Sequence, residues 1–332
     1  MAMINELAPN SSTNHQGRLA YVPDDLLPPE IVGAIFEQAQ ETSLVLRLGE
    51  RIPVSYGETV IPIQTKRPEV GQVGTGTTNA LREGGTKPLS GVAWDTQSFS
   101  PIKLATIVTV SEEFARTNPQ GFYSKIQSDM ALAIGRGIDL AVFHGKQPLT
   151  GGALSGITST NVLNNTTNVV NLDTVPGPGN LYDELIAGYE MIDPETDFDG
   201  WAVDTRFRAR LIREGAERDA NGNLVNPAGI NFNGTRGNIL GFPAEYGKAV
   251  KGDLGAATAS TTQIIGGDFS QLRWGFADEV RIKISDQATL TDGVSSISMW
   301  QTNQIALLIE VTFGWIVGNL DGFVKFTNPS GS

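Results

Sequence analysis

Three acidic side chains at alternate positions precede a glycine, which is how a calcium-binding loop begins. They are Glu195, Asp197 and Asp199, and Gly200 follows them. Such a loop ends at its twelfth position on a glutamate that holds the ion with both carboxylate oxygens. Here that position is Arg206, whose positive charge repels a cation. We therefore expect an acidic turn before a strand rather than a metal site.

The side chains that turnover chemistry requires are scarce. Cysteine is absent, which excludes disulfides, thiolate metal sites and cysteine nucleophiles. Only two histidines occur, and His144 is expected at a helix C-terminus, where the helix dipole favours it. No serine stands in a nucleophile-elbow motif, and the glycine-rich stretches 74–76 and 84–87 match neither a dinucleotide nor a phosphate loop. We expect no enzyme and no cofactor.

Five arginines cluster on and just after a predicted helix: Arg206, Arg208, Arg210, Arg213 and Arg218. Arginine is suited to interfaces and to phosphate groups. Five acidic residues lie close by in the sequence, and the whole chain carries a net charge of -12. Because tight binding of nucleic acid needs an excess of lysine and arginine, a solvated helix face or a contact between copies is favoured over nucleic-acid readout.

The charge is unevenly distributed along the chain. Residues 54–110 carry five basic and four acidic side chains, a net of +1, whereas residues 151–300 carry 11 basic and 19 acidic side chains, a net of -8. A near-neutral segment beside an acidic body suits docking between copies, and ordinary solubility explains the same distribution. No apolar run is long enough to cross a bilayer, and the N-terminus lacks the pattern of a signal peptide. Synthesis in the cytoplasm and no membrane partner are expected.

Two long segments dominate the organisation of the chain, and the first is an extended arm over Val54–Val110. The β-branched residues of Thr59–Thr65 predict one strand, Thr96–Val110 predicts the returning strand, and glycines surround a tip at Thr75–Glu83. An isolated two-stranded ribbon is at best marginally stable in water. The arm therefore needs a partner to pack on, which indicates assembly rather than catalysis.

The second segment is a long helix over Ser111–Gly145. Ser111 and the two glutamates after it favour a helix start, and Pro119 interrupts the helix. Apolar residues recur at every fourth position from Phe122 to Val142. Because this period exceeds 3.6 residues, the apolar stripe winds around the helix, and its two ends are expected to contact different neighbours. An ordinary amphipathic core helix explains the stripe equally well.

Taken in order, these segments resemble the major capsid proteins of tailed bacteriophages, whose α+β Johnson fold is shared with encapsulins. The resemblance covers most of residues 44–327 and rests on the arm followed by a helix with its Asp139…Gly145 end. It also rests on three short motifs: Arg218-Asp219-Ala220-x-Gly222-x-Leu224, Leu240-Gly241-x-Pro243, and Gly267-Asp268-Phe269-Ser270 before a strand.

The resemblance implies four parts. Residues 1–53 would form an N-terminal arm, and residues 54–110 an extension loop that lies over a neighbouring subunit. A peripheral domain with the long spine helix would comprise 111–149 and 291–332. An axial domain, 150–290, would meet its copies around the centres of hexamers and pentamers.

The resemblance also implies partners. Hexamers and pentamers would close an icosahedral shell around double-stranded phage DNA, which this acidic chain would contact weakly and non-specifically. Members with a fused scaffold carry a long helical N-terminal extension, which is absent here, so a separate scaffolding protein is expected. A portal would complete the shell, a decoration or cement protein is an optional partner, and assembly in the cytoplasm of the host bacterium would yield the virion capsid.

Some members of this family cross-link covalently. In them a lysine of the extension loop attacks an asparagine of a neighbouring subunit, and a glutamate seven residues after that asparagine acts as base. Asn303 and Glu310 match this spacing, and Lys66 or Lys87 would be the nucleophile. An apolar site would favour a neutral amine and a basic carboxylate. The alternative is a surface asparagine and a strand glutamate that pairs with an arginine.

Two other functions are weighed against a phage coat. An encapsulin-type shell shares the fold but encloses a cargo enzyme, and genes neighbouring this one would separate the two. A β-rich hydrolase or binding domain is disfavoured because no catalytic set of side chains is present.

Overall fold

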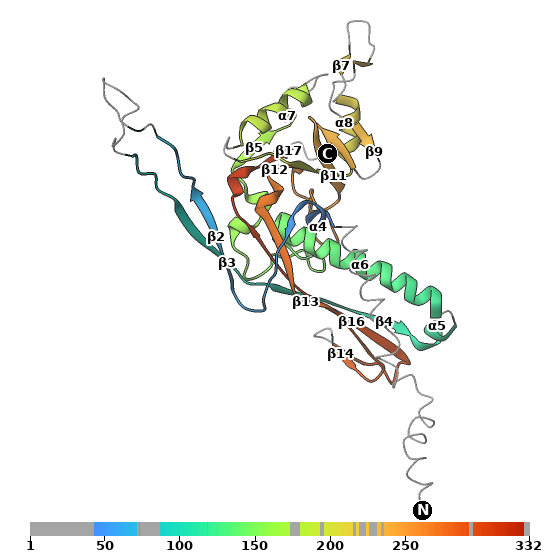
Figure 1. Cartoon of the computed structure of the whole chain (residues 1–332). Coiled ribbons are helices and arrows are strands. Elements are labelled where there is room, and N and C mark those ends of the chain that lie inside the picture. The colour runs from blue at the N-terminus through green and yellow to red at the C-terminus, as the bar shows by residue number, and fades with distance from the viewer. Residues whose placement is uncertain are drawn as a thin grey trace, which may run out of the picture.

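The computed structural model describes residues 43–71, 73, 87–117, 119–172, 180–192, 196–214, 217–218, 224–225, 231–233, 236–291 and 295–328. It has the expected α+β character, with two large sheets, a long helix and a projecting arm (Figure 1). The predicted arm tip at Thr75–Glu83, the predicted N-terminal arm up to residue 42, and Asp219 to Gly222 of the first short motif lie outside the described residues.

The long helix is present in two pieces, α5 (Glu112–Thr117) and α6 (Pro119–His144). The predicted interruption is therefore confirmed, and Pro119 occupies the first position of α6, where its missing N–H costs nothing. Every residue from Ile138 to Phe143 is buried, so the C-terminal end of α6 is enclosed on all sides. The chain turns away at Gly145, whose φ of 64° favours glycine.

A four-stranded sheet packs against α6. Its strands lie in the order β1 (Glu50–Arg51), β13 (Leu272–Ser285), β16 (Gln304–Val317) and β4 (Ile102–Ser111). The β1–β13 pair is parallel and the other two pairs are antiparallel. Ile309 and Val311 of β16 share one buried cluster with Ile134 and Ile138 of α6, so this helix and this sheet form a single core.

The expectation that Thr96–Val110 is one returning strand of the arm is wrong. The chain divides at Ser100 and Pro101: β3 (Ala93–Phe99) pairs with β2 (Thr59–Lys66), whereas β4 pairs along its whole length with β16. Proline has no N–H to donate to a ladder, and the long apolar strand β16 offers β4 a partner inside the body. The arm is therefore shorter than predicted, and its last nine residues, 102–110, belong to the core sheet.

The second sheet has seven strands. Their order is β5 (Asn168–Asn171), β17 (Phe323–Thr327), β12 (Thr262–Gly267), β6 (Gly200–Asp204), β11 (Phe242–Gly247), β10 (Arg236–Ile239) and β9 (Asn231–Asn233). Two helices, α7 (Asn180–Glu190) and α8 (Arg208–Glu214), contribute to its separate core, in which Leu185 and Leu211 share a cluster with Trp201 of β6.

The remaining elements are short. They are α4 (Leu44–Leu48), the hairpin of β14 (Thr289–Thr291) and β15 (Ser296–Ser298), the pair β7 (Glu217–Arg218) and β8 (Leu224–Val225), and 3₁₀ turns at Ser159–Asn161, Leu163–Asn165, Phe269–Gln271 and Leu320–Gly322. The two large sheets interleave in sequence, because β13 joins the four-stranded sheet while β12 before it and β17 after it join the seven-stranded sheet.

Candidate assembly surface

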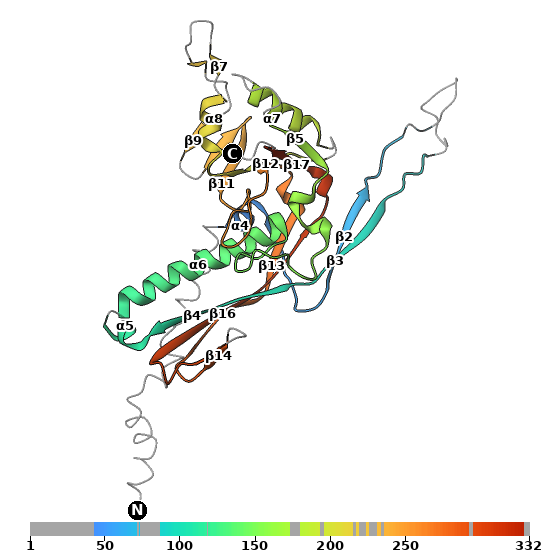
Figure 2. The ribbon, with the colours of Figure 1, turned by 180° about the vertical axis from the view of Figure 1, so that it is seen from behind.

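The β2–β3 ribbon stands away from the body in both views (Figures 1 and 2). Its two strands pair only with each other. Residues opposite one another in a ladder share a face, so Val60, Pro62 and Trp94 lie on the same face of the ribbon. Val60 is 57% exposed and Trp94 is 63% exposed. Large apolar side chains left in water on a projecting element are characteristic of a protein interaction surface.

The opposite face of the ribbon is anchored to the body at its root. Phe99, which pairs with Thr59, is 6% exposed, and the side-chain amide of Gln97 donates to the carbonyl oxygen of Gly318 at 3.3 Å. Ile61 pairs with Gln97 and is half-buried. The arm therefore has one face turned toward its own subunit and one face with no partner within it.

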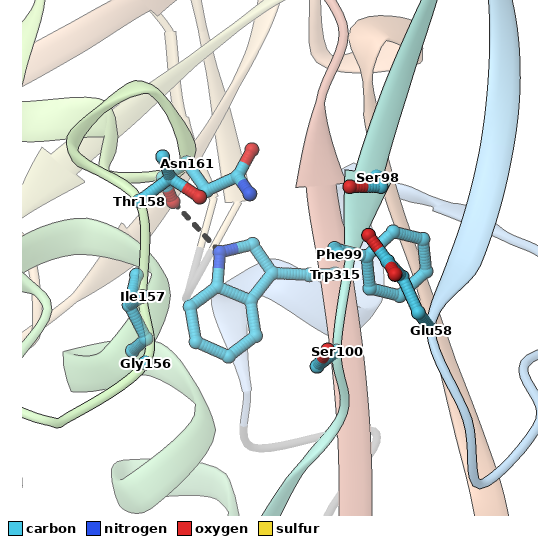
Figure 3. A pocket seen from close by; sticks show the side chains of 9 residues that line it. All are labelled: Glu58, Ser98, Phe99, Ser100, Gly156, Ile157, Thr158, Asn161 and Trp315. Atoms are coloured by element: carbon cyan, nitrogen blue, oxygen red, sulfur yellow. Dashed lines mark hydrogen bonds between the residues drawn. The ribbon is translucent and has the colours of Figure 1, made fainter.

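A cavity of about 170 Å³ lies beside this root (Figure 3). The arm contributes Glu58, Ser98, Phe99 and Ser100, the loop before β5 contributes Gly156, Ile157, Thr158 and Asn161, and β16 contributes Trp315. The indole N–H of Trp315 donates to the carbonyl oxygen of Asn161 at 2.7 Å. Glu58 is the one titratable side chain in this lining, and Ser98, Ser100 and Thr158 contribute hydroxyl groups to it.

Further exposed apolar side chains lie on the other side of the body, on α5 and on and after the β14–β15 hairpin. Phe114 is 58% exposed, Trp300 is 65% exposed and Ile297 is 45% exposed. The amide of Glu112 donates to the carbonyl oxygen of Asn303 at 3.0 Å, which ties α5 to the turn before β16. Figures 1 and 2 place this end and the arm on opposite sides of the body. Two different apolar surfaces on opposite sides suit head-to-tail contacts between copies, which form rings where the rotation closes and open filaments where it does not.

Asp139 on α6 holds the start of α4 against the core. One carboxylate oxygen accepts from the Ser43 hydroxyl at 2.5 Å and from the Val45 amide at 3.1 Å, and the other accepts from the Leu44 amide at 3.1 Å. Complete burial raises the pKa of Asp139 to about 6, and the three hydrogen bonds oppose this rise. The carboxylate caps the N-terminus of α4 from another helix, so its role in the Asp139…Gly145 motif is structural.

His144 is the last residue of α6, as predicted, but the reason differs from the expected interaction with the helix dipole. Its Nε2 lies 3.1 Å from the carbonyl oxygen of Ala249 and 2.9 Å from that of Val250. Both partners only accept, so Nε2 carries the proton and donates. Burial lowers the pKa of His144. The ring holds the loop at Ala249 and Val250 against the end of α6.

The described part of the acidic stretch, residues 196–199, is a loop that leads directly into a strand. Asp199 accepts from the amide of Phe269 at 2.8 Å, Asp197 is exposed, and β6 begins at Gly200. Glu195 lies outside the described residues, and Arg206 forms an ion pair with Asp253. Within the described part of the chain, no three metal-binding side chains come together.

The arginines of the cluster that the structure describes interact within their own subunit. Arg206 pairs with Asp253, the Arg208 guanidinium lies 5.5 Å from the centre of the Tyr246 ring, and that of Arg210 lies 5.4 Å from the Phe207 ring. The side chains of Arg213 and Arg218 lie outside the described residues. These contacts agree with a structural role for the three described arginines.

The four residues of the predicted cross-link are dispersed in one subunit. Lys66 ends β2, with its side chain outside the described residues, and Lys87 is exposed on the returning segment. Asn303 is exposed in the turn before β16, with a φ of 56°. Glu310 pairs with Lys103 at 2.9 Å, which lowers the pKa of Glu310; the expected partner was an arginine. Seven residues of extended strand span about 23 Å, so Asn303 and Glu310 of one chain do not meet.

No helix in the described part of the chain has both the length and the apolar character needed to cross a membrane.

Comparison with known proteins gives consistent results. Residues 24–328 match the model of the phage capsid family. The chain is 25% identical over 320 residues to the probable major capsid protein gp17 of Mycobacterium phage D29, a match that covers 91% of this chain and 90% of that protein. It is 26% identical over 313 residues to the protein of the same description from Mycobacterium phage L5, covering 91% and 89%.

Solved structures are similar over the same range. A chain from Gordonia phage Cozz superposes with a TM-score of 0.69 at 29% identity, covering 86% of each chain. The capsid of an empty GTA particle superposes with a TM-score of 0.52 at 13% identity, covering 85% of this chain and 88% of that one. At that identity the second likeness concerns the fold alone.

Proposed function

This chain belongs to the phage capsid family, and on that premise we propose that it is a major capsid protein, which self-assembles into the shell of a tailed bacteriophage. The observation that carries the proposal is the arm. Its outward face, with Val60 and Trp94, has no partner within the subunit, and a two-stranded ribbon of this kind becomes stable by packing on something else. A second copy of the chain supplies that surface in a shell.

The finer assembly follows from this proposal. Hexamers and pentamers close an icosahedral shell around double-stranded DNA, and the net charge of -12 keeps contacts with that DNA weak and non-specific. A separate scaffolding protein guides assembly in the host cytoplasm, a portal completes the shell, and a decoration protein is an optional addition. The family and both curated relatives are phage proteins, which favours a phage coat over an encapsulin-type compartment.

We also propose the four-part division of the chain: arm 1–53, extension loop 54–110, peripheral domain 111–149 with 291–332, and axial domain 150–290. Supporting it, the β2–β3 ribbon lies within the second part, and α5, α6 and β16 lie within the third. The end of the second part, in β4, pairs with β16 of the third. The interleaving of β12, β13 and β17 between the two large sheets means that the last two parts also share strands at their junction.

Co-expression with the scaffolding protein of the same phage tests the proposed function. Size-exclusion chromatography and electron microscopy should then show closed shells. A monodisperse monomer with the scaffolding protein present would contradict the proposal.

Covalent cross-linking is a further proposal about the same shell. The amine nitrogen of Lys66 or Lys87 attacks the side-chain carbonyl carbon of Asn303 in a neighbouring subunit, an isopeptide C–N bond forms, and ammonia leaves. Because Asn303 and Glu310 of one chain do not meet, Glu310 of another copy takes the proton of the attacking amine and returns it to the leaving nitrogen. The exposure of Lys87 and Asn303 supports this reaction. The Lys103–Glu310 ion pair opposes it, because it makes the carboxylate a weaker base.

Denaturing gels of mature particles measure this reaction directly. Cross-linked shells should show ladders of covalent oligomers, and Asn303→Ala should remove them. The control is Asn319→Ala, which changes an asparagine outside the predicted set. A single band near 35.5 kDa from wild-type particles would end this proposal without affecting the coat function.

A further inference from the structure

Two glycines face each other on the surface of the four-stranded sheet. Gly275 of β13 and Gly314 of β16 are direct partners in the ladder. Neither has a positive φ, so the backbone conformation at both positions is open to any residue. Glycine in a strand interior weakens it unless another backbone approaches closely, and a reason other than chain conformation must therefore be found for this pair.

The reason is the space occupied by the root of the arm, which consists of residues 52–54 where the arm leaves the body and Phe99 where it returns. A Cβ atom at Gly275 would lie 2.2 Å from the carbonyl oxygen of Ile52 and 2.6 Å from Cγ2 of Val54. At Gly314 it would lie 2.7 Å from Cε2 of Phe99 and 3.1 Å from Cγ1 of Val54. Non-bonded carbon atoms prefer about 3.5–4.0 Å. The two ends of the arm therefore rest directly on the glycine pair.

The path of the chain explains why the arm needs this pair. The chain runs beside β13 at one edge of the sheet, where the amide of Ile52 donates to the carbonyl oxygen of Trp274 at 2.7 Å. It leaves as the arm, returns through Phe99, and continues as β4 at the opposite edge. The root of the arm must therefore cross the two central strands, β13 and β16. It crosses them at Gly275 and Gly314, where neither strand has a side chain.

We propose that Gly275 and Gly314 form a saddle that sets the direction in which the arm leaves the body, and thereby the surface of a neighbouring copy that the arm reaches. On one side the root is held by the hydrogen bond from Gln97 to Gly318, and on another it borders the cavity lined by Glu58 and Ser98. The cavity leaves the root of the arm room to move on that side. The close contact with the two glycines therefore determines the angle between the arm and the body. The role in assembly rests on the proposed coat function.

The absence of cysteine makes a direct measurement possible. Two exposed positions, Thr96 on the arm and Gln301 on the body, are replaced by cysteine and spin-labelled, and electron–electron double resonance gives the distance distribution between them in the isolated subunit. Gly275→Ala and Gly314→Ala should each shift or broaden this distribution. Gly57→Ala is the matched control, because a Cβ there meets nothing within 4 Å, and it should leave the distribution unchanged.

A rescue variant separates direction from misfolding. Combining Gly314→Ala with Phe99→Leu shortens the side chain that the new methyl group would strike, and the wild-type distance should return. An unchanged distance distribution in both single alanine variants would overturn the proposal that the glycine pair directs the arm. A changed distribution that Phe99→Leu does not restore, accompanied by a lower melting temperature, would also overturn it, because general destabilisation would then be the cause.

Assembly with the scaffolding protein then links the saddle to the shell. The two alanine variants should give aberrant or open particles, whereas Gly57→Ala should give closed ones. Closed, regular shells from variants with a displaced arm would overturn the role in choosing the neighbour's surface. If the wild-type chain itself formed no shells, the coat function would fail, while the distance measurement would still decide whether the saddle directs the arm.

Discussion

Replacing Val60 and Trp94 together by aspartate should give a folded subunit that does not close a shell. Both side chains are more than half exposed on the outward face of the arm, so the isolated subunit should lose little stability, within about 0.5 kcal/mol for such surface substitutions. Against a neighbouring copy the same change removes buried apolar area and places two carboxylates in an interface without partners, which is strongly unfavourable. Because every copy carries the change, the penalty recurs at each arm contact.

Electron microscopy and analytical ultracentrifugation after co-expression with the scaffolding protein measure the outcome. The matched control is Thr258→Asp combined with Thr261→Asp, which adds the same two charges at exposed positions outside the arm. The control should assemble, whereas the double variant on the arm should remain as unassembled subunits or small rings. Full-size shells from the double variant in wild-type yield would show that the outward face of the arm is not an interface.

Asp139→Ala should cause the largest loss of subunit stability among single substitutions on α6. The change leaves the Ser43 hydroxyl and the amides of Leu44 and Val45 without their acceptor in a fully buried site. A single buried donor left unsatisfied costs about 1–3 kcal/mol. Since three donors lose their partner here, we expect α4 to detach from α6 and the melting temperature to fall by several degrees.

The matched control is Asp129→Ala on the same helix. Asp129 is exposed and forms an ion pair with Lys125 one turn away, an interaction that contributes at most about 0.5 kcal/mol. Thermal denaturation followed by circular dichroism compares the two variants with the wild type. Equal melting temperatures for Asp139→Ala and Asp129→Ala would show that Asp139 does not hold α4 against α6.

The effect of Asp139 should also depend on pH, with a definite sign. Burial raises the pKa of this carboxyl from 3.8 to about 6, so the folded protein binds the proton more tightly than the unfolded chain does. Its contribution to stability is therefore complete below about pH 4 and declines as the pH rises through 6. The difference in free energy of unfolding between wild type and Asp139→Ala should be larger at pH 4 than at pH 7.

The parts of the fold that the sequence predicted are those with local signals. Pro119 marks the start of α6, the apolar stripe marks its length, and the β-branched run marks β2. Alternation alone could not tell whether Val60 or Ile61 faces outward, because that depends on where the body lies. The departure of β4 from the arm was missed because its partner, β16, lies about two hundred residues later in the chain, and such pairing leaves no local pattern.

The contacts that hold α4 and the arm leave no local signal in the sequence. Asp139 stood out only as part of the Asp139…Gly145 motif, and its partners at Ser43 to Val45 lie outside any helical spacing. Nothing in the sequence around Gly275 and Gly314 distinguishes them from other glycines in strands. Their role comes only from the arm, which crosses both strands at these two positions. The resemblance to cross-linking capsid proteins pointed to Asn303 and Glu310, but it carries no information about Lys103, which forms an ion pair with the Glu310 carboxylate.

A cryo-electron microscopy map of particles assembled from this chain tests the central claim most directly. We predict a closed shell in which the outward face of the β2–β3 arm, with Val60 and Trp94, is buried against a neighbouring subunit. A closed shell with that face in solvent would contradict the proposed role of the arm, and the absence of any shell with the scaffolding protein present would contradict the coat function itself.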